Sequence, residues 1–116
     1  WTQGPGMMGL LYRRDLFREA GLPDRGPEDF EEFLQFARKL TNPREDRYGL
    51  EIRLEGMSWS TLSFLYSCGG RLVDQDANGE WRCAFDSNEA VDAYHFVARM
   101  LLEPFDVGNG RFTTIA

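Results

Sequence analysis

The sequence is poor in positive charge and in long apolar runs. Its 13 Lys and Arg residues stand against 19 Asp and Glu residues, which gives a formal net charge of -6. Nucleic acids and anionic membrane surfaces attract clusters of Lys and Arg, so this balance disfavours both as partners. No apolar run approaches the about 18 residues that indicate a membrane-spanning helix.

Signals of catalysis and of metal binding are also scarce. The single histidine, His95, falls within a helical pattern, where a structural or surface role is expected because general-base chemistry needs a positioned partner. There is no Gly-x-Ser-x-Gly motif, no phosphate-binding loop and no His and Cys cluster with metal-ligand spacing. The acids between Asp74 and Asp86 are predicted to be solvated rather than a glycosidase pair. We expect no catalytic residue, cofactor or metal.

Cysteine is limited to Cys68 and Cys83. Two cysteines are too few for a disulfide framework, and their spacing matches no zinc motif. Two buried free thiols are the simpler interpretation. A disulfide would close a loop of about 15 residues, would add roughly 3 kcal/mol of stability and would require an oxidising compartment.

What the chain does contain is typical of a globular protein. Of its 116 residues, 42% are hydrophobic and 14% aromatic, which excludes a disordered tail. This length corresponds to one domain or to part of one. The chain begins Trp1-Thr2-Gln3 without a Met or a signal-like region, and residues 112–116 resemble a strand. These ends indicate a piece of a longer protein, and we treat residues 1–116 as a single domain.

The longest uncharged stretch, residues 56–70 (GMSWSTLSFLYSCGG), predicts a mostly buried helix. It is expected to begin near Ser58 and to stop at Gly69-Gly70. Hydroxyl side chains lie on one face and apolar ones on the other: Ser58, Ser60, Thr61, Ser63 and Ser67 against Trp59, Leu62, Leu65 and Tyr66. An aromatic ring beside hydroxyls suits a polar, uncharged ligand such as a sugar. The alternative is that Trp59 is an ordinary core aromatic.

Hydrophobic spacing predicts the remaining elements of the chain. They are a buried strand at 7–12, a helix at 13–20, a helix at 27–40 with Pro27 in its first turn, a strand at 48–54, a hairpin at 71–85, a helix from about 87 to 102 capped by Asp86, and a strand at 112–116. The inward side of the last helix is expected to carry Ala90, Val91, Tyr94, Val97, Ala98 and Leu101. Interleaved helices and strands predict an α/β fold, with a parallel, right-handed crossover through helix 27–40.

Five segments in this order resemble a known family. They are LLYRRDLFREAGLP, PEDFEEFLQFARKLT, YGLEI, SFLYSCGGRLVDQD and FDSNEAVDAY, which together span about residues 4–102. They resemble the extracellular solute-binding proteins of family 1, the maltose-binding-protein-like sugar receptors of ABC importers. The resemblance implies an α/β fold, namely a partial lobe of a periplasmic-binding-protein-like (type II) fold with a small mixed sheet flanked by helices. It further implies that the chain is a fragment of the second, C-terminal lobe of a two-lobed protein.

The resemblance also implies a ligand site. In the family, an aromatic residue just before the helix that ends in Gly-Gly stacks on the sugar, and Trp59, ten residues before Gly69, matches that position. Met57 and Ser58 would line the same wall. The tryptophan expected near the start of the preceding helix is absent, and Gly26-Pro27-Glu28 stands in its place.

The implied function is that of a carbohydrate-binding, non-enzymatic component of an ABC importer. It would act in the periplasm or lipid-anchored outside the cell membrane, with a membrane permease as partner. A non-sugar solute on the same fold, or an unrelated structural or interaction module, are the alternatives. Without the first lobe, an exposed sheet edge and cleft surface would favour self-association of the fragment.

Overall fold

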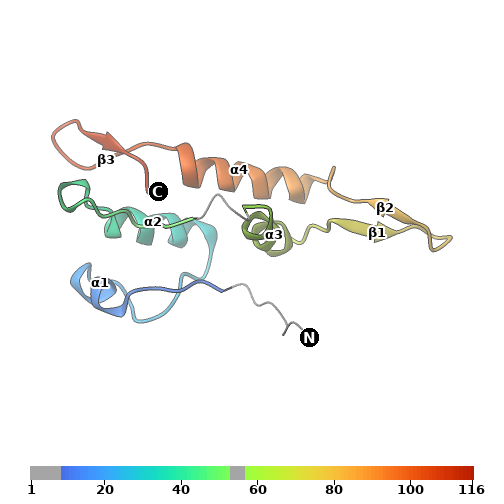
Figure 1. The fold of residues 1–116 in the computed structure, drawn as a ribbon, viewed down its shortest axis with the longest axis horizontal. Helices are drawn as coiled ribbons and strands as arrows, with labels where there is room; N and C mark the ends of the chain where they lie inside the picture. Colours follow the sequence, from blue (N-terminus) through green and yellow to red (C-terminus); the bar gives the residue numbers. More distant parts are fainter. Residues whose placement is uncertain (1–8, 53–56) are drawn as a thin grey trace, which may run out of the picture.

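The computed structural model describes residues 9–52 and 57–116, with side chains described from residue 61 onward in the second range. The molecule is elongated, with extents of 59 × 37 × 26 Å. Its radius of gyration, 17.2 Å, exceeds the about 13 Å expected for a compact domain of this length. Figure 1 shows α2 and α3 one after the other along the same side of α4, and a hairpin that projects beyond α3. Much apolar surface is therefore left open.

The first helix, α1 (Arg14–Glu19), ends as its sequence predicts. Gly21 adopts the left-handed conformation, with φ of +65°. The Leu22 amide donates to the Phe17 carbonyl at 2.8 Å, and the Gly21 amide donates to Arg18 at 3.2 Å, which closes the helix end in the Schellman pattern. Leu22 and Phe17 are thereby buried together against Phe36.

The second helix, α2 (Phe30–Leu40), begins three residues later than predicted. Asp29, and not Gly26, is its N-cap, because the Asp29 carboxylate accepts a hydrogen bond from the Glu32 amide at 2.7 Å. Pro27 consequently lies in the connection before the helix. The helix predicted in this region is confirmed, and its Leu34 and Ala37 are buried in the main core.

The third helix, α3 (Met57–Ser67), confirms the helix predicted from the uncharged stretch. Leu65 is buried against Ala90 and Ala93. Tyr66, which was expected on the inner face, is 57% exposed, because the helix instead directs Phe64 toward α2 and α4.

The fourth helix, α4 (Asn88–Leu102), is capped by Ser87 and not by Asp86, since the Ser87 hydroxyl accepts from the Ala90 amide at 3.3 Å. Its buried side differs in part from the prediction. The buried residues are Ala90, Ala93, Phe96, Val97 and Met100. The expected inward residues Val91, Tyr94 and Ala98 are exposed. The contacts of Phe96 with Phe30, Phe33 and Phe64 explain this rotation, because they bring the aromatic side of α4 to the core.

The strands form two separate antiparallel pairs. The predicted hairpin is confirmed as β1 (Val73–Gln75) and β2 (Trp81–Cys83), with Val73 opposite Cys83. The second pair joins β3 (Phe105–Asp106) to β4 (Phe112–Thr113), and a short 3₁₀ turn, η1, spans Pro43–Glu45. Helices combined with small sheets confirm the α/β class and agree with a partial lobe.

The predicted parallel crossover is not formed by the residues that the structure describes. Residues 9–12 and 48–52 carry no strand, and Leu10 and Leu11 are 50% and 95% exposed. Leu50 donates its amide hydrogen to Ile115 at 2.9 Å, so segment 48–52 lies beside the C-terminal segment. The two expected strands are separated by a groove, described below.

Both cysteines are free thiols. Cys68 is half-buried beside the α3–α4 contact, and this burial raises the pKa of its thiol. Cys83 is exposed on β2. The prediction of two buried thiols is therefore wrong for Cys83 and only partly correct for Cys68. An isolated position on a short hairpin explains the exposure of Cys83.

Candidate functional site

The three predicted ligand-binding residues, Met57, Ser58 and Trp59, form the first turn of α3. Their side chains lie outside the described residues. The C-terminal part of α3 is anchored in the fold, because Leu65 is 1% exposed and the Gly70 amide donates to the Leu65 carbonyl at 3.0 Å. A side chain at position 70 would meet Leu65 Cδ1 at 2.4 Å, which shows how closely the helix end is packed.

A groove runs between the N-terminal segment, α2 and residues 48–52. It consists of two adjoining hollows of about 500 Å³ and about 610 Å³. Both hollows are lined by the same six residues, Gly9, Leu10, Pro27, Phe33, Leu50 and Glu51. The larger hollow continues to α3, where Ser63, Phe64 and Ser67 form its wall. The groove therefore reaches the face of the helix whose first turn carries the predicted site.

The larger hollow combines an apolar floor with a polar rim. Phe30, Phe33 and Phe64 contribute aromatic surface, while Glu28 and Asp29 lie along the rim. Among the described residues, neither Lys nor Arg lines this hollow. Arg13 lines the smaller one, but Asp15 binds its guanidinium, with Nε to Oδ1 at 2.8 Å. Such a surface suits a ligand without negative charge.

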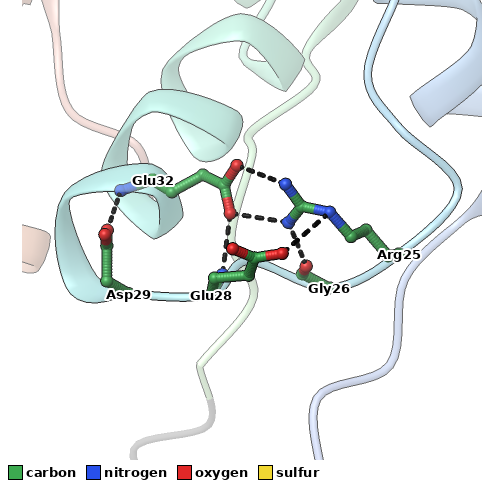
Figure 2. A network of polar contacts seen from close by, with 5 residues as sticks. All are labelled: Arg25, Gly26, Glu28, Asp29 and Glu32. Carbon is green, nitrogen blue, oxygen red and sulfur yellow. Dashed lines mark hydrogen bonds and ion pairs between the residues drawn. The ribbon is translucent and has the colours of Figure 1, made fainter.

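A polar network holds the rim at the start of α2 (Figure 2). The Arg25 guanidinium donates to both Glu32 carboxylate oxygens, at 2.7 and 2.9 Å, and to the Gly26 carbonyl at 2.9 Å. Glu32 Oε2 also accepts from the Glu28 amide at 2.7 Å, and Arg25 Nε lies 3.4 Å from the Glu28 carboxylate. Asp29 and Glu32 have the N-cap and N3 spacing of a capping box. This signal is present in the sequence and identifies the first residue of α2.

This network predicts a measurable acid sensitivity. The hydrogen bonds from the Arg25 side chain and then from the Glu28 amide lower the pKa of Glu32 from 4.5 to about 2. The ionised carboxylate is therefore favoured by the folded state, and its stabilising effect, present above pH 4.5, is lost as the pH falls toward about 2. Urea unfolding across this range should show wild type losing stability relative to Glu32→Gln. A Glu32 carboxyl midpoint near 4.5 in an NMR titration would contradict the prediction.

The opposite wall of the groove is held by Thr41 and Gly49. The Thr41 hydroxyl donates to the Ala37 carbonyl at 2.8 Å and accepts from the Gly49 amide at 2.9 Å. An added Cβ at position 49 would lie 1.9 Å from the Ala37 oxygen. Only glycine allows segment 48–52 to approach α2 this closely. Sequence reasoning missed this contact, since alternation within 48–54 says nothing about what the glycine faces.

The described residues offer little for chemistry. No three of their His, Cys, Asp or Glu side chains are grouped so that they could hold a metal ion. His95 is exposed on α4. None of the described helices is both long and apolar enough to cross a bilayer.

Comparison with known proteins identifies the family. Searches of curated proteins and of solved structures gave no match. The family model described as bacterial extracellular solute-binding protein matches residues 2–110, nearly the whole chain. This match agrees with the ordered segments that carry the resemblance and with the helices built from them. The chain therefore belongs to the bacterial extracellular solute-binding protein family.

Proposed function

We propose that this chain is part of the C-terminal lobe of a two-lobed receptor that delivers a carbohydrate to an ABC importer. The observation that carries the proposal is α3 (Met57–Ser67), a helix without a charged residue whose first turn contains Trp59. The family supplies the general activity, which is solute binding outside the cytoplasm. The sugar, the importer and the lobe assignment are the proposed refinements.

The register of α3 supports a role for position 59. Ser63 and Ser67 line the groove, and position 59 precedes them by one and two turns of the helix. Residues four apart lie on the same helical face, so we expect position 59 to continue the line of Ser63 and Ser67 along the groove wall. We expect the Trp59 ring to stack on a sugar there, with Met57 and Ser58 beside it.

The charge of the groove supports a neutral ligand. The described lining of the larger hollow offers carboxylates and hydroxyls and lacks a cation. The lining includes the carboxylates of Asp29 and of Glu28, of which Glu28 is paired with Arg25, and this excess of acids disfavours a phosphorylated or otherwise anionic solute. A sugar instead offers hydroxyls to polar side chains and C–H faces to aromatic rings. The proposed receptor is a binding protein and not an enzyme, and it works in the periplasm or anchored at the outer face of the membrane.

The proposal is tested by ligand titration of the complete two-lobed protein. Replacing Trp59 with alanine removes the stacking surface, and the affinity for an oligosaccharide should fall by roughly tenfold or more, equivalent to about 1.4 kcal/mol per factor of ten. Isothermal titration calorimetry measures this change without relying on tryptophan fluorescence. Trp59→Phe keeps an aromatic face and should retain much of the binding.

The matched control is Trp81→Ala. Trp81 is 70% exposed on β2, outside the groove, so this change should leave affinity unaltered. Equal affinity of wild type and Trp59→Ala, with both folded, would remove Trp59 from the site. If the protein binds a non-sugar solute and Trp59→Ala lowers that affinity, the proposed site is retained and the proposed ligand class is wrong.

A further inference from the structure

Two Asn-Gly pairs occur in exposed turns that the ligand site does not use. Asn78-Gly79 lies in the β1–β2 hairpin, and Asn109-Gly110 lies between β3 and β4. Both asparagines are exposed to solvent. Glycine after asparagine leaves the intervening backbone nitrogen unshielded, because no Cβ stands beside it. These pairs are candidates for spontaneous chemical modification.

We propose that Asn109 is a deamidation site and that it reacts before Asn78. In this reaction the backbone nitrogen of Gly110 attacks the side-chain carbonyl carbon of Asn109. A new C–N bond forms, the bond to the side-chain amide nitrogen breaks, and ammonia leaves with the proton given up by the backbone amide. Water then opens the resulting succinimide at either carbonyl, which yields aspartate or isoaspartate at position 109.

The turn around Asn109 leaves the attacking nitrogen available. Asn109 and Gly110 both have positive φ, +58° and +69°, as in a type I′ turn. The hydrogen bonds that hold the turn come from its neighbours. The Val107 amide donates to the Arg111 carbonyl at 2.8 Å, the Arg111 amide to the Gly108 carbonyl at 3.3 Å, and the Gly108 amide to the Asp106 carboxylate at 2.7 Å. No described acceptor receives the Gly110 amide hydrogen. The flanking strands are only two residues long, so the turn opens at low cost.

The turn around Asn78 restrains the equivalent nitrogen. The Gly79 amide donates to the Asp76 carbonyl at 3.0 Å. The Asp76 carboxylate accepts from the Asn78 amide at 2.8 Å and from the Glu80 amide at 3.0 Å. Attack by Gly79 requires this bonded loop to be broken first. Both pairs have the same sequence, Asn-Gly, so their intrinsic reactivity is alike. The hydrogen bonds of the folded chain therefore decide which asparagine deamidates first.

Modification at position 109 should also affect the packing of the main core. Isoaspartate inserts an extra backbone carbon into the turn that pairs Phe105 with Thr113. Ile115, two residues beyond, is 2% exposed in the main core, and its carbonyl accepts from Leu50. A lengthened turn shifts this pairing, so deamidation at Asn109 should loosen the C-terminal segment that closes one side of residues 48–52.

Peptide mapping of the folded full chain tests the order. After incubation at mildly alkaline pH, cleavage after Arg residues places Asn78 in peptide 72–82 and Asn109 in peptide 100–111. Mass spectrometry should show conversion of Asn109 several-fold faster than that of Asn78. In urea, where the turns are absent, the two rates should approach each other. Equal or reversed rates in the folded chain would overturn the proposal.

Variants separate the hydrogen-bond argument from simple exposure. Asp76→Ala removes the carboxylate that holds the first turn, and Asn78 should then react faster while Asn109 keeps its rate. Gly110→Ala shields the attacking nitrogen and should slow conversion at Asn109 without changing it at Asn78. An unchanged Asn78 rate in Asp76→Ala, with the chain folded by circular dichroism, would refute the role assigned to that turn.

Discussion

Replacing Phe96 with alanine should lower the free energy of unfolding by about 3–5 kcal/mol, the loss typical of a buried aromatic residue. Phe96 is 5% exposed. Its ring stacks on Phe30 at 4.1 Å between centroids and meets Phe64 at 5.3 Å and Phe33 at 5.9 Å. These partners join α2 and α3 to α4, so one truncation removes contacts to both helices. Urea unfolding followed by circular dichroism measures the loss.

Phe112 provides a matched control, because the same substitution there removes a ring that is 68% exposed on β4. Surface substitutions away from special features usually change stability within about 0.5 kcal/mol. Comparable losses for Phe96→Ala and Phe112→Ala would show that the Phe96 ring does not organise the core. A loss of stability in Phe96→Ala that clearly exceeds the loss in Phe112→Ala would agree with the prediction.

Substituting alanine for Gly49 should have the next largest effect, at the upper end of the about 1–3 kcal/mol that overpacking costs. The new methyl carbon would lie 1.9 Å from the Ala37 oxygen and 2.5 Å from its carbonyl carbon. These are backbone atoms of α2, so neither can rotate away. Segment 48–52 would have to retreat, and the Gly49 amide would lose its hydrogen bond to Thr41. Thermal or urea unfolding measures the destabilisation.

Gly26→Ala is the matched control for this prediction. A Cβ at Gly26 would meet nothing within 4 Å, and no left-handed φ is required there. That variant should unfold within about 0.5 kcal/mol of wild type. If both glycine variants were equally stable, segment 48–52 could not be packed on α2 as described.

Where local rules decide a structure, the sequence was sufficient to predict it. The end of α1 follows from Gly21 and Leu22, whose positive φ and backfolded amide are properties of a few neighbouring residues. The β1–β2 hairpin follows from its turn residues around Asn78-Gly79 in the same way. The limits of α3 follow from an uncharged stretch that Gly69 ends, with φ of +84°.

Where distant contacts decide, prediction was incomplete. The buried side of α4 depends on which of its apolar residues finds a partner, and Phe96 rather than Tyr94 meets the aromatic residues of α2 and α3. The strands expected at 7–12 and 48–54 depend on a neighbour to pair with, and alternation alone does not supply one. The first residue of α2 was misplaced because Pro27 was assigned to the first turn, whereas Asp29 caps the helix.

The candidate site likewise has a part that local sequence determines and a part that distant contacts determine. The position of Trp59 at the start of α3 could be predicted, because helix limits are local. The groove could not, since its walls come from the N-terminal segment, α2, residues 48–52 and α3, which only the folded chain brings together. The Arg25–Glu32 pairing spans seven residues and likewise depends on the path of the chain between them.

Helix α2 contributes buried side chains to two different clusters. Leu34 and Ala37 belong to the core shared with α4, while Phe36 belongs to the cluster formed with Phe17 and Leu22. A helix of six residues such as α1 has no appreciable stability in isolation. Its folding is therefore conditional on α2, and α1 with its following turn would open as a local unit while the rest of the core stayed intact. The stability of this chain is therefore hierarchical, because α1 is folded only while it packs against α2.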